Sequence, residues 1–312
     1  KYDDCVNDDV LRTRIDEAAD AGFEMMFTVS PVQMDETLKS AVHYPDIKFL
    51  NCSVNLSQNA VRTYYGRMYE AKFLMGFIAG TRNHGHRIGY LANYPIYGAV
   101  AEINAFAIGA AMADPECEIY LAWSSVKNFD WREYFHEMDT DLALGPDFIK
   151  PDAATREFGL YRLGDDGKIQ NLAFPLWDWG KYYQLIIDQV LDGTWDDNPT
   201  DGAKALNYWW GISSDVIDVI LSPHLPYQTY KLADILRQSM HRELLNPFYG
   251  EIWAQGHRKI KGFGTPKFSN EEILTMTWLN DNIFGNLPLE DELVPEVEKA
   301  VSVSGTLENE KS

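Results

Sequence analysis

Aromatic side chains crowd the stretch LAFPLWDWGKYY, residues 172–183, which includes Trp177, Trp179, Tyr182 and Tyr183. Such rings can stack on a flat ligand or fill a core. Tyr183 starts an apolar pattern of helical spacing over residues 183–191, so we expect it in the core. Trp177 and Trp179 precede that helix, and side chains two apart in an extended segment point to the same side. We expect both to contact a ligand; the alternative is that they seal a hinge between two lobes.

Sequence motifs for catalysis are missing. The chain has no G-x-S-x-G elbow, no Walker loop and no G-x-G-x-x-G. His84 and His86 have no evident third metal ligand, and the three cysteines are too scattered for a zinc site or a disulfide framework. We therefore expect no enzyme, no catalytic residue, no metal and no cofactor.

Charge and hydropathy exclude further classes. Lys and Arg number 27 against 47 Asp and Glu, so the net charge is −20. An acidic surface of this kind argues against nucleic acid and against direct adsorption to anionic lipid. No apolar run approaches the roughly 18 residues of a membrane span.

Apolar strand-like segments alternate with helical ones through the first half of the chain. This pattern predicts parallel sheets covered by helices on both faces, an α/β class. We also expect helices near 131–144 and 227–245 and over 269–285, where Ser269 and Glu272 form a capping box. The chain opens on a helix, so the first strand of a doubly wound lobe is expected to be missing. The expected helices and strands of the first half are 7–22, 23–29, 31–43, 47–53, 69–80, 87–92, 100–113 and 117–123.

A length of 312 residues favours two lobes over one core. We expect lobe 1 to hold residues 1–86 with about 172–203, and lobe 2 to hold 87–171 with about 204–250. Residues 251–312 form a C-terminal segment with a helix at 269–284 and an acidic tail.

Candidate ligand contacts follow from the position of the strands. In doubly wound sheets, ligands bind beyond the carboxyl ends of the strands. Asp165 stands out among many carboxylates because it follows an expected strand. The residues placed after the expected strands are Ser30, Ser53, Asn93, Tyr94, Lys150, Asp152, Asp165 and Trp177.

Several segments, in this order and spacing, are similar to one known family. They include TYYGRMYEAKFLMGFIAG (63–80), RIGYLANYPI (87–96), GPDFIKPD (145–152), PLWDWGKYY (175–183) and ILTMTWLNDNIFGNLP (273–288). The chain resembles, over about residues 8–288, the basic membrane protein family, the substrate-binding lipoproteins of ABC importers, many of which bind purine nucleosides. The resemblance implies a type I periplasmic-binding fold with two doubly wound lobes, a hinge and a ligand in the inter-lobe cleft. It also implies an extracytoplasmic location, a membrane contact only through a lipid anchor, an ABC permease as partner, and no catalysis.

The resemblance also assigns family contacts to positions of this chain. The acidic contact after GYLA falls at Asn93 and Tyr94, and the stretch after DFI falls at Lys150 to Asp152. The ribose-binding Asp aligns with Asp165 or its neighbour, and the ribose-binding Lys falls at Trp177. Because an indole cannot replace an ammonium–hydroxyl contact, this departure favours a flat ligand with a polar edge over a strict nucleoside site.

Two functions follow as alternatives. The first is a solute-binding protein of an ABC importer that encloses a small aromatic, nucleoside-like ligand. The second is a sensing or regulatory domain of the same fold that is not coupled to transport.

Overall fold

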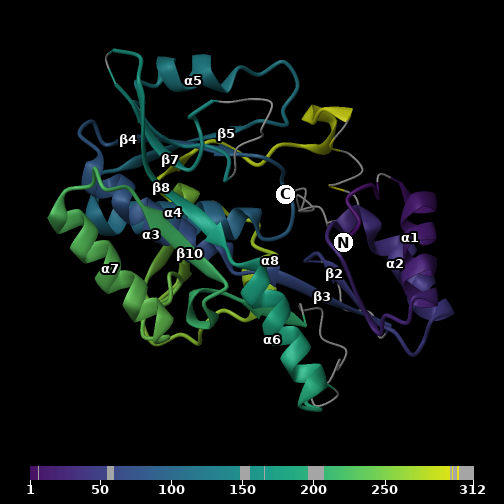
Figure 1. Cartoon of the computed structure of the whole chain (residues 1–312). Helices are drawn as coiled ribbons and strands as arrows, with labels where there is room; N and C mark the ends of the chain where they lie inside the picture. Colours follow the sequence, from purple (N-terminus) through teal and green to yellow (C-terminus); the bar gives the residue numbers. More distant parts are fainter. Residues whose placement is uncertain are drawn as a thin grey trace. The chain divides into compact units, whose positions relative to one another are not determined.

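The computed structural model describes residues 1–5, 7–54, 60–147, 155–164, 166–195, 207–295, 297 and 301. The chain divides into two compact units, drawn in Figure 1. Unit 1 holds 1–65, 184–209 and 299–306, and unit 2 holds 66–183, 210–298 and 307–312. The helix at 68–82, expected in lobe 1, lies in unit 2, because it packs against the helix at 99–113.

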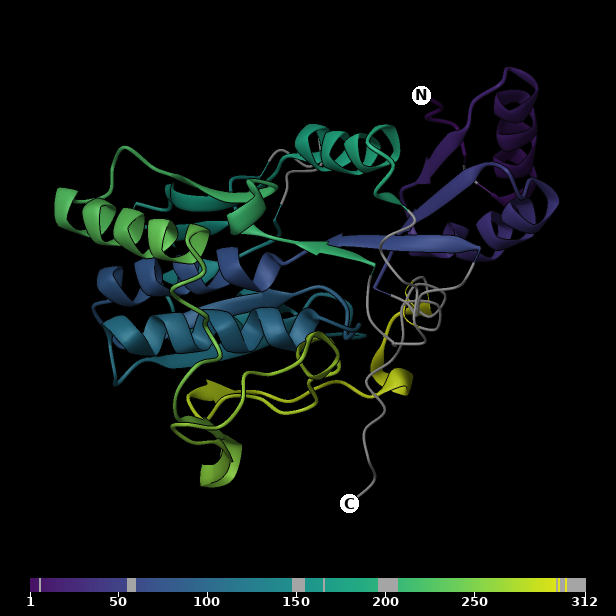
Figure 2. The same ribbon diagram turned by 90° about the horizontal axis from the view of Figure 1, so that it is seen from below.

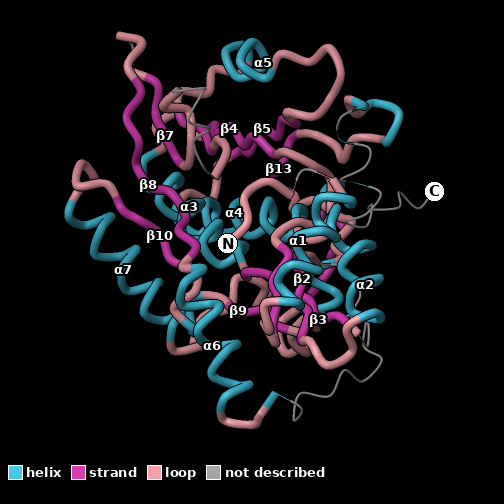
Figure 3. Tube along the Cα trace, turned by 45° about the vertical axis from the view of Figure 1, so that its right-hand side comes forward, coloured by secondary structure: helices cyan, strands magenta, loops and turns pink. Residues whose placement is uncertain are grey.

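Unit 1 is built on a four-stranded sheet of order β1-β2-β3-β9. The pairs β1–β2 and β2–β3 are parallel. Leu11 and Ile15 of α1 and Met34 of α2 pack with Phe49 of β2, so both helices cover the same face of the sheet (Figure 3). The elements are α1 (Asp8–Asp20), β1 (Met25–Thr28), α2 (Met34–His43), β2 (Lys48–Cys52), β3 (Val61–Gly66) and β9 (Tyr208–Trp210), with a short 3-10 helix at Pro31–Gln33.

Unit 2 contains a seven-stranded sheet of order β10-β8-β7-β6-β4-β5-β13. β4 is parallel to β5 and β6, and β13 is parallel to β5. β7 runs antiparallel to β6 and β8, and β10 runs antiparallel to β8, so the sheet is mixed. Its strands are β4 (Arg87–Ala92), β5 (Glu118–Trp123), β6 (Leu142–Leu144), β7 (Leu160–Leu163), β8 (Ile169–Trp177), β10 (Ile217–Leu221) and β13 (Ile283–Phe284).

Helices cover both faces of this sheet, as Figure 1 shows. Phe135 of α5 packs with Leu91 and Ala122 on one face, whereas Tyr90 meets Phe106 of α4 on the other, as strand alternation requires. The remaining elements are α3 (Met68–Arg82), α4 (Ala99–Ala113), α5 (Trp131–Glu137), α6 (Trp179–Leu191), α7 (Tyr227–His241), α8 (Asn270–Leu274) and the hairpin β11 (Ile252–Ala254) and β12 (Arg258–Lys261), with short 3-10 helices at Ile212–Ser214, Gln255–His257 and Glu290–Glu292.

Helices α3 and α4 run side by side in the same direction and touch through their backbones (Figure 2). A Cβ added to Gly76 would lie 2.0 Å from the Phe106 carbonyl oxygen, and one added to Gly109 would lie 2.1 Å from that of Phe73. No side chain fits at either contact, so glycine is required there. These two glycines therefore allow the backbones of α3 and α4 to touch.

The α/β class and the parallel strands are confirmed, but two expected helices are wrong in length. The helix expected over 269–285 ends at Leu274, although its capping box at Ser269 and Glu272 is present. The buried side chain of Asn104 bonds the Trp278 carbonyl and the Asn280 N–H, both at 2.8 Å, and this fixes the following residues outside a helix.

The helix expected near 131–144 ends at Glu137, and residues 142–144 form strand β6, which completes the sheet beside β4. Strand β3 was not expected at all. Within the residues that the structure describes, no helix is long and apolar enough to span a membrane.

Candidate functional site

Polar residues lie at the carboxyl edge of the sheet in unit 2. Asn93 and Tyr94 follow β4 and are exposed, as expected for residues beyond a strand end. Ser124 follows the neighbouring strand β5, and its hydroxyl donates to the Asn93 Oδ1 over 3.2 Å. The topology therefore brings Asn93, Tyr94 and Ser124 together at the edge where open α/β sheets bind ligands.

A buried charged cluster lies near the same edge. Lys72 on α3 is 3% exposed and forms an ion pair with Asp147, which follows β6. Glu102 stands in the first turn of α4, and the parallel packing of α3 on α4 that pairs Gly76 with Phe106 also places it near Lys72. The Lys72 ammonium is 5.9 Å from the centre of the Tyr90 ring, which belongs to β4.

One ammonium faces two carboxyl groups in this cluster. Burial raises the pKa of Glu102 to about 7, Lys72 opposes this shift, and Asp147 adds to it. Because Asp147 already holds the ion pair, Glu102 keeps a proton more readily than an exposed glutamate. Among the described residues no hydrogen bond reaches the Glu102 carboxyl group, so it can donate to or accept from a ligand.

The aromatic stretch divides at the end of β8. Trp177 is the last residue of β8, opposite Ile217 on β10, and it is partly buried. Trp179 already belongs to α6, where it packs on Tyr182 and is stacked on Tyr183 at 6.1 Å. The extended geometry that would point Trp177 and Trp179 to the same side is therefore not present.

The core residue of this stretch is Tyr182 rather than Tyr183. Tyr182 is 1% exposed, whereas Tyr183 is only partly buried. Tyr182 lies 5.0 Å from Trp210, so rings from two segments pack together, and Ile186 one turn later is fully buried. The apolar face of α6 is thus shifted by one residue from the expected one.

In unit 1 the candidate Ser30 follows β1 and is partly buried. Its carbonyl oxygen accepts a hydrogen bond from the Asn51 amide at 3.0 Å, and its side chain makes no capping bond with the helical turn that follows. Ser30 and Asn51 therefore meet at the carboxyl edge of the parallel sheet of unit 1.

Three other candidates, Lys150, Asp152 and Asp165, lie outside the described residues. The expectation for Asp165 depends on a parallel strand before it, but β7 is not parallel to its neighbours. β7 is antiparallel to β6, so its end at Leu163 lies beside Asp141, where β6 begins. The end of β7 is therefore at the opposite edge of the sheet from Asn93.

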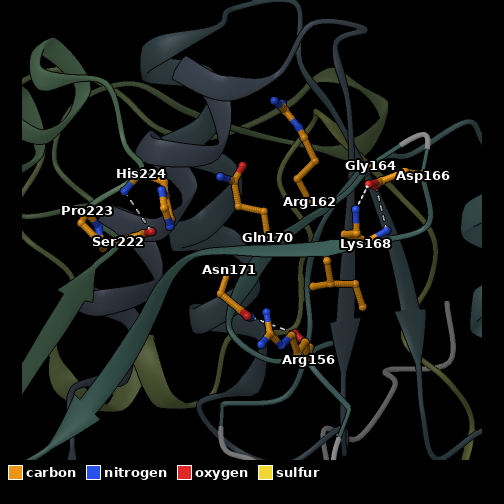
Figure 4. A pocket seen from close by; sticks show the side chains of 11 residues that line it. Arg156, Arg162, Gly164, Asp166, Lys168, Gln170, Asn171, Ser222, Pro223 and His224 are labelled. Carbon is orange, nitrogen blue, oxygen red and sulfur yellow. Dashed lines mark hydrogen bonds and ion pairs between the residues drawn. The ribbon is translucent and has the colours of Figure 1, made fainter.

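A pocket of about 610 Å³ lies at that opposite edge, around the start of β8 (Figure 4). Arg162 and Gln170 lie on one side of the strand and Arg156 and Asn171 on the other, so the two guanidinium groups do not converge on one ligand. Six residue steps of β8, roughly 20 Å, separate Asn171 at this pocket from Trp177. We therefore place the candidate site at the carboxyl edge and not in this pocket.

The cluster of Lys72, Glu102 and Asp147 was not anticipated from the sequence. One signal was available: Lys72 is a charged residue inside a helix whose residues 68–80 are all buried. Its partners come from two other elements, so the spacing of residues gave no indication of them.

A family model described as "ABC transporter substrate-binding protein PnrA-like" matches residues 4–130. A purine-binding protein of Brucella abortus is 28% identical over 293 residues, which are 88% of this chain and 79% of that protein. A putative ABC transporter glucose-binding protein of Haloferax volcanii is 25% identical over 214 residues, 64% of this chain and 52% of that protein.

Two solved structures have a similar fold. A transcriptional activator of the comK gene from Bacillus halodurans superposes with a TM-score of 0.59 at 15% identity, covering 78% of this chain and 87% of its own. An ABC transporter solute-binding protein from Conexibacter woesei superposes with a TM-score of 0.54 at 16% identity. The match covers 77% of this chain and 84% of that protein. These likenesses support a type I periplasmic-binding fold.

Proposed function

We propose that the chain is a substrate-binding protein of an ABC importer, which binds a purine base or nucleoside and delivers it to an ABC permease. The purine-binding relative, similar over most of both chains, supports this ligand class. The proposed role is binding and transfer, without catalysis.

The observation that carries the proposal is the carboxyl edge of unit 2. It combines exposed polar side chains at Asn93, Tyr94 and Ser124 with the Glu102 carboxyl group, which makes no hydrogen bond among the described residues. Trp177 ends a strand at the same edge of the sheet. A flat solute whose edge carries hydrogen-bonding groups matches this combination of an aromatic ring and polar groups.

Isothermal titration of the purified chain with adenine, guanine, hypoxanthine, adenosine and glucose tests the ligand class. We expect saturable binding of at least one purine and none of glucose. Binding of glucose and of no purine would refute the purine proposal and favour a sugar ligand, as the name of the Haloferax relative indicates. A chain that binds nothing in this panel would refute the purine proposal.

Alanine substitution at Trp177 tests the proposed stacking contact, with Tyr183→Ala as the matched control. Losing a base–aromatic stack costs about 1–3 kcal/mol, which weakens affinity roughly 5- to 150-fold. We expect this loss for Trp177→Ala and a smaller one for Tyr183→Ala, because Tyr183 stacks on Trp179 instead. Equal affinities combined with unequal losses of stability would make both residues structural.

We further propose an extracytoplasmic location with attachment through a lipid anchor. Substrate-binding proteins of ABC importers act outside the cytoplasm. Uptake of radiolabelled purine by cells with and without the gene distinguishes transport from the alternative, a sensing domain of the same fold. Unchanged uptake in the deletion strain would favour sensing.

A further inference from the structure

Glu102 stands where a solute at the carboxyl edge of unit 2 can reach it. The loop that follows β4 at this edge leads directly into α4, and Glu102 is in the first turn of that helix. Its neighbours Val100, Ala101 and Ile103 are each 1% exposed, whereas solvent reaches part of the Glu102 side chain. Glu102 is therefore on the side of α4 that is open to a solute.

The charged and titratable groups that face Glu102 come from three other elements. They are the Lys72 ammonium on α3, the Asp147 carboxylate after β6 and the Tyr90 phenol on β4. The Lys72 ammonium is ion-paired with Asp147, and burial raises the pKa of Tyr90, which keeps the phenol uncharged. The cluster therefore offers one positive charge to two carboxyl groups, and Asp147 already holds it.

A charge on Glu102 would have no positive partner of its own in this cluster. Burying a charge without a partner is unfavourable, and a group in this position keeps its proton instead. The pKa of Glu102 follows this expectation: burial raises it to about 7, Lys72 opposes the shift, and Asp147 adds to it. Roughly half of the molecules therefore carry the uncharged carboxyl group at pH 7, and about nine-tenths carry it at pH 6.

An uncharged carboxyl group and a carboxylate suit different solutes. The uncharged group has an O–H donor beside a C=O acceptor, whereas a carboxylate only accepts hydrogen bonds. One edge of adenine carries the complement, an amino N–H donor next to a ring-nitrogen acceptor. Two hydrogen bonds can form between that edge and the uncharged group, but a carboxylate would face the ring nitrogen with a second acceptor. No hydrogen bond from a described residue occupies either oxygen of Glu102.

We propose that Glu102 recognises the bound solute as an uncharged carboxyl group and selects a solute edge that carries an N–H donor next to an acceptor. This inference rests on the proposed purine-binding function and names the residue that reads the edge of the purine. The Glu102 O–H donates to the acceptor of the solute, and the Glu102 carbonyl oxygen accepts from the N–H. Ionisation of Glu102 removes the O–H donor, so the affinity for the solute falls as the pH rises.

Isothermal titration of the wild type at pH 6, 7 and 8 tests this dependence. The probes are adenine, guanine, hypoxanthine and adenosine, each of which carries an N–H donor next to an acceptor. The apparent dissociation constant is the intrinsic one divided by the fraction of protein in the binding form. With a pKa of about 7, this fraction falls from about 0.9 at pH 6 to about 0.1 at pH 8, so the affinity should fall roughly 10-fold. Binding at pH 8 should also take up close to one proton, which makes the measured heat depend on the buffer.

Two substitutions of Glu102 separate its hydrogen bonds from its charge. Glu102→Gln keeps a donor beside an acceptor and does not titrate, so its affinity should match that of the wild type at pH 6 and stay constant up to pH 8. Glu102→Ala lacks both groups and should bind roughly 5- to 150-fold more weakly at pH 6, as for two lost hydrogen bonds. Glu137→Ala is the matched control, because Glu137 is exposed at the end of α5. This variant should keep both the affinity and the pH dependence of the wild type.

The outcomes separate the role of Glu102 from the function on which it rests. If the wild type binds none of the four purines at any pH, the proposed function fails, and the role of Glu102 with it. If the wild type binds equally well at pH 6 and pH 8, or if Glu102→Ala binds as tightly as the wild type, only the role of Glu102 is overturned. A fall in affinity that persists in Glu102→Gln also overturns it, because another group would then be titrating. Melting curves of the unliganded variants show whether each is folded; if Glu102→Ala is not, the pH dependence and Glu102→Gln decide.

Discussion

The protonation of Glu102 gives a prediction about stability and pH. Its pKa is raised from 4.5 to about 7, first by burial and then by Asp147, against the opposing effect of Lys72. A carboxyl group with a raised pKa stabilises the fold while it is protonated, and this contribution is lost as pH rises through the folded-state value. Glutamine resembles the protonated acid and does not titrate, so Glu102→Gln should not lose this stability as the pH rises.

The magnitude follows from the size of the shift. Each pKa unit corresponds to about 1.36 kcal/mol, so the full shift would give roughly 3.4 kcal/mol. Solvent still reaches part of the Glu102 side chain, which reduces the effect. We expect the free energy of unfolding of Glu102→Gln, relative to that of the wild type, to increase by about 1–3 kcal/mol as the pH rises from 5 to 8.

Urea unfolding of both proteins at pH 5, 6, 7 and 8 provides the measurement. The difference between the two free energies of unfolding at each pH reports on Glu102 alone. Other titrating groups, such as Glu70, whose pKa is also raised by burial, are present in both proteins and cancel. Glu137→Gln is the control, since Glu137 is exposed at the end of α5 and has no described ion pair or hydrogen bond. A wild-type-to-Glu102→Gln difference that stays constant with pH would refute the reasoning.

Three substitutions and one control variant probe the stability of unit 2, each by urea unfolding. Gly109→Ala should cost about 3 kcal/mol, because its Cβ would lie 2.1 Å from a backbone oxygen, whereas Gly85→Ala meets nothing within 4 Å and should change stability by less than about 0.5 kcal/mol. Asn104→Leu should cost about 2–4 kcal/mol, since it leaves a buried N–H and a carbonyl of residues 278–280 unpaired. Ser269→Ala should cost about 1 kcal/mol through loss of the helix cap. A Gly109→Ala variant as stable as Gly85→Ala would contradict the first prediction. An unchanged free energy of unfolding in Asn104→Leu or in Ser269→Ala would contradict the other two.

Elements with local signals were predictable from the sequence. The helix α1 has Asn7 as its cap and buries Leu11 and Ile15 on one side, and both features can be read from spacing alone. The capping box at Ser269 was equally local, but the end of that helix depends on Asn104, far away in the sequence. Local patterns cannot show where a distant side chain interrupts a helix.

The candidate site was predictable only in part for the same reason. Asn93 and Tyr94 follow a parallel strand, so the strand-end rule located them correctly at the carboxyl edge. The rule failed for the turn after β7, because antiparallel pairing depends on partners and not on the strand itself. The Lys72 cluster joins three elements, and the sequence shows only a lysine that precedes the apolar run at residues 73–80.

The backbone contact between α3 and α4 limits how unit 2 can move. Lys72 and Glu102 stand on two helices that cannot slide past one another, because the glycine contacts leave no room for a side chain to pass. We therefore expect a displacement of one helix to move the other with it. Hydrogen exchange at the buried amides of α3 and α4 should accordingly rise and fall together.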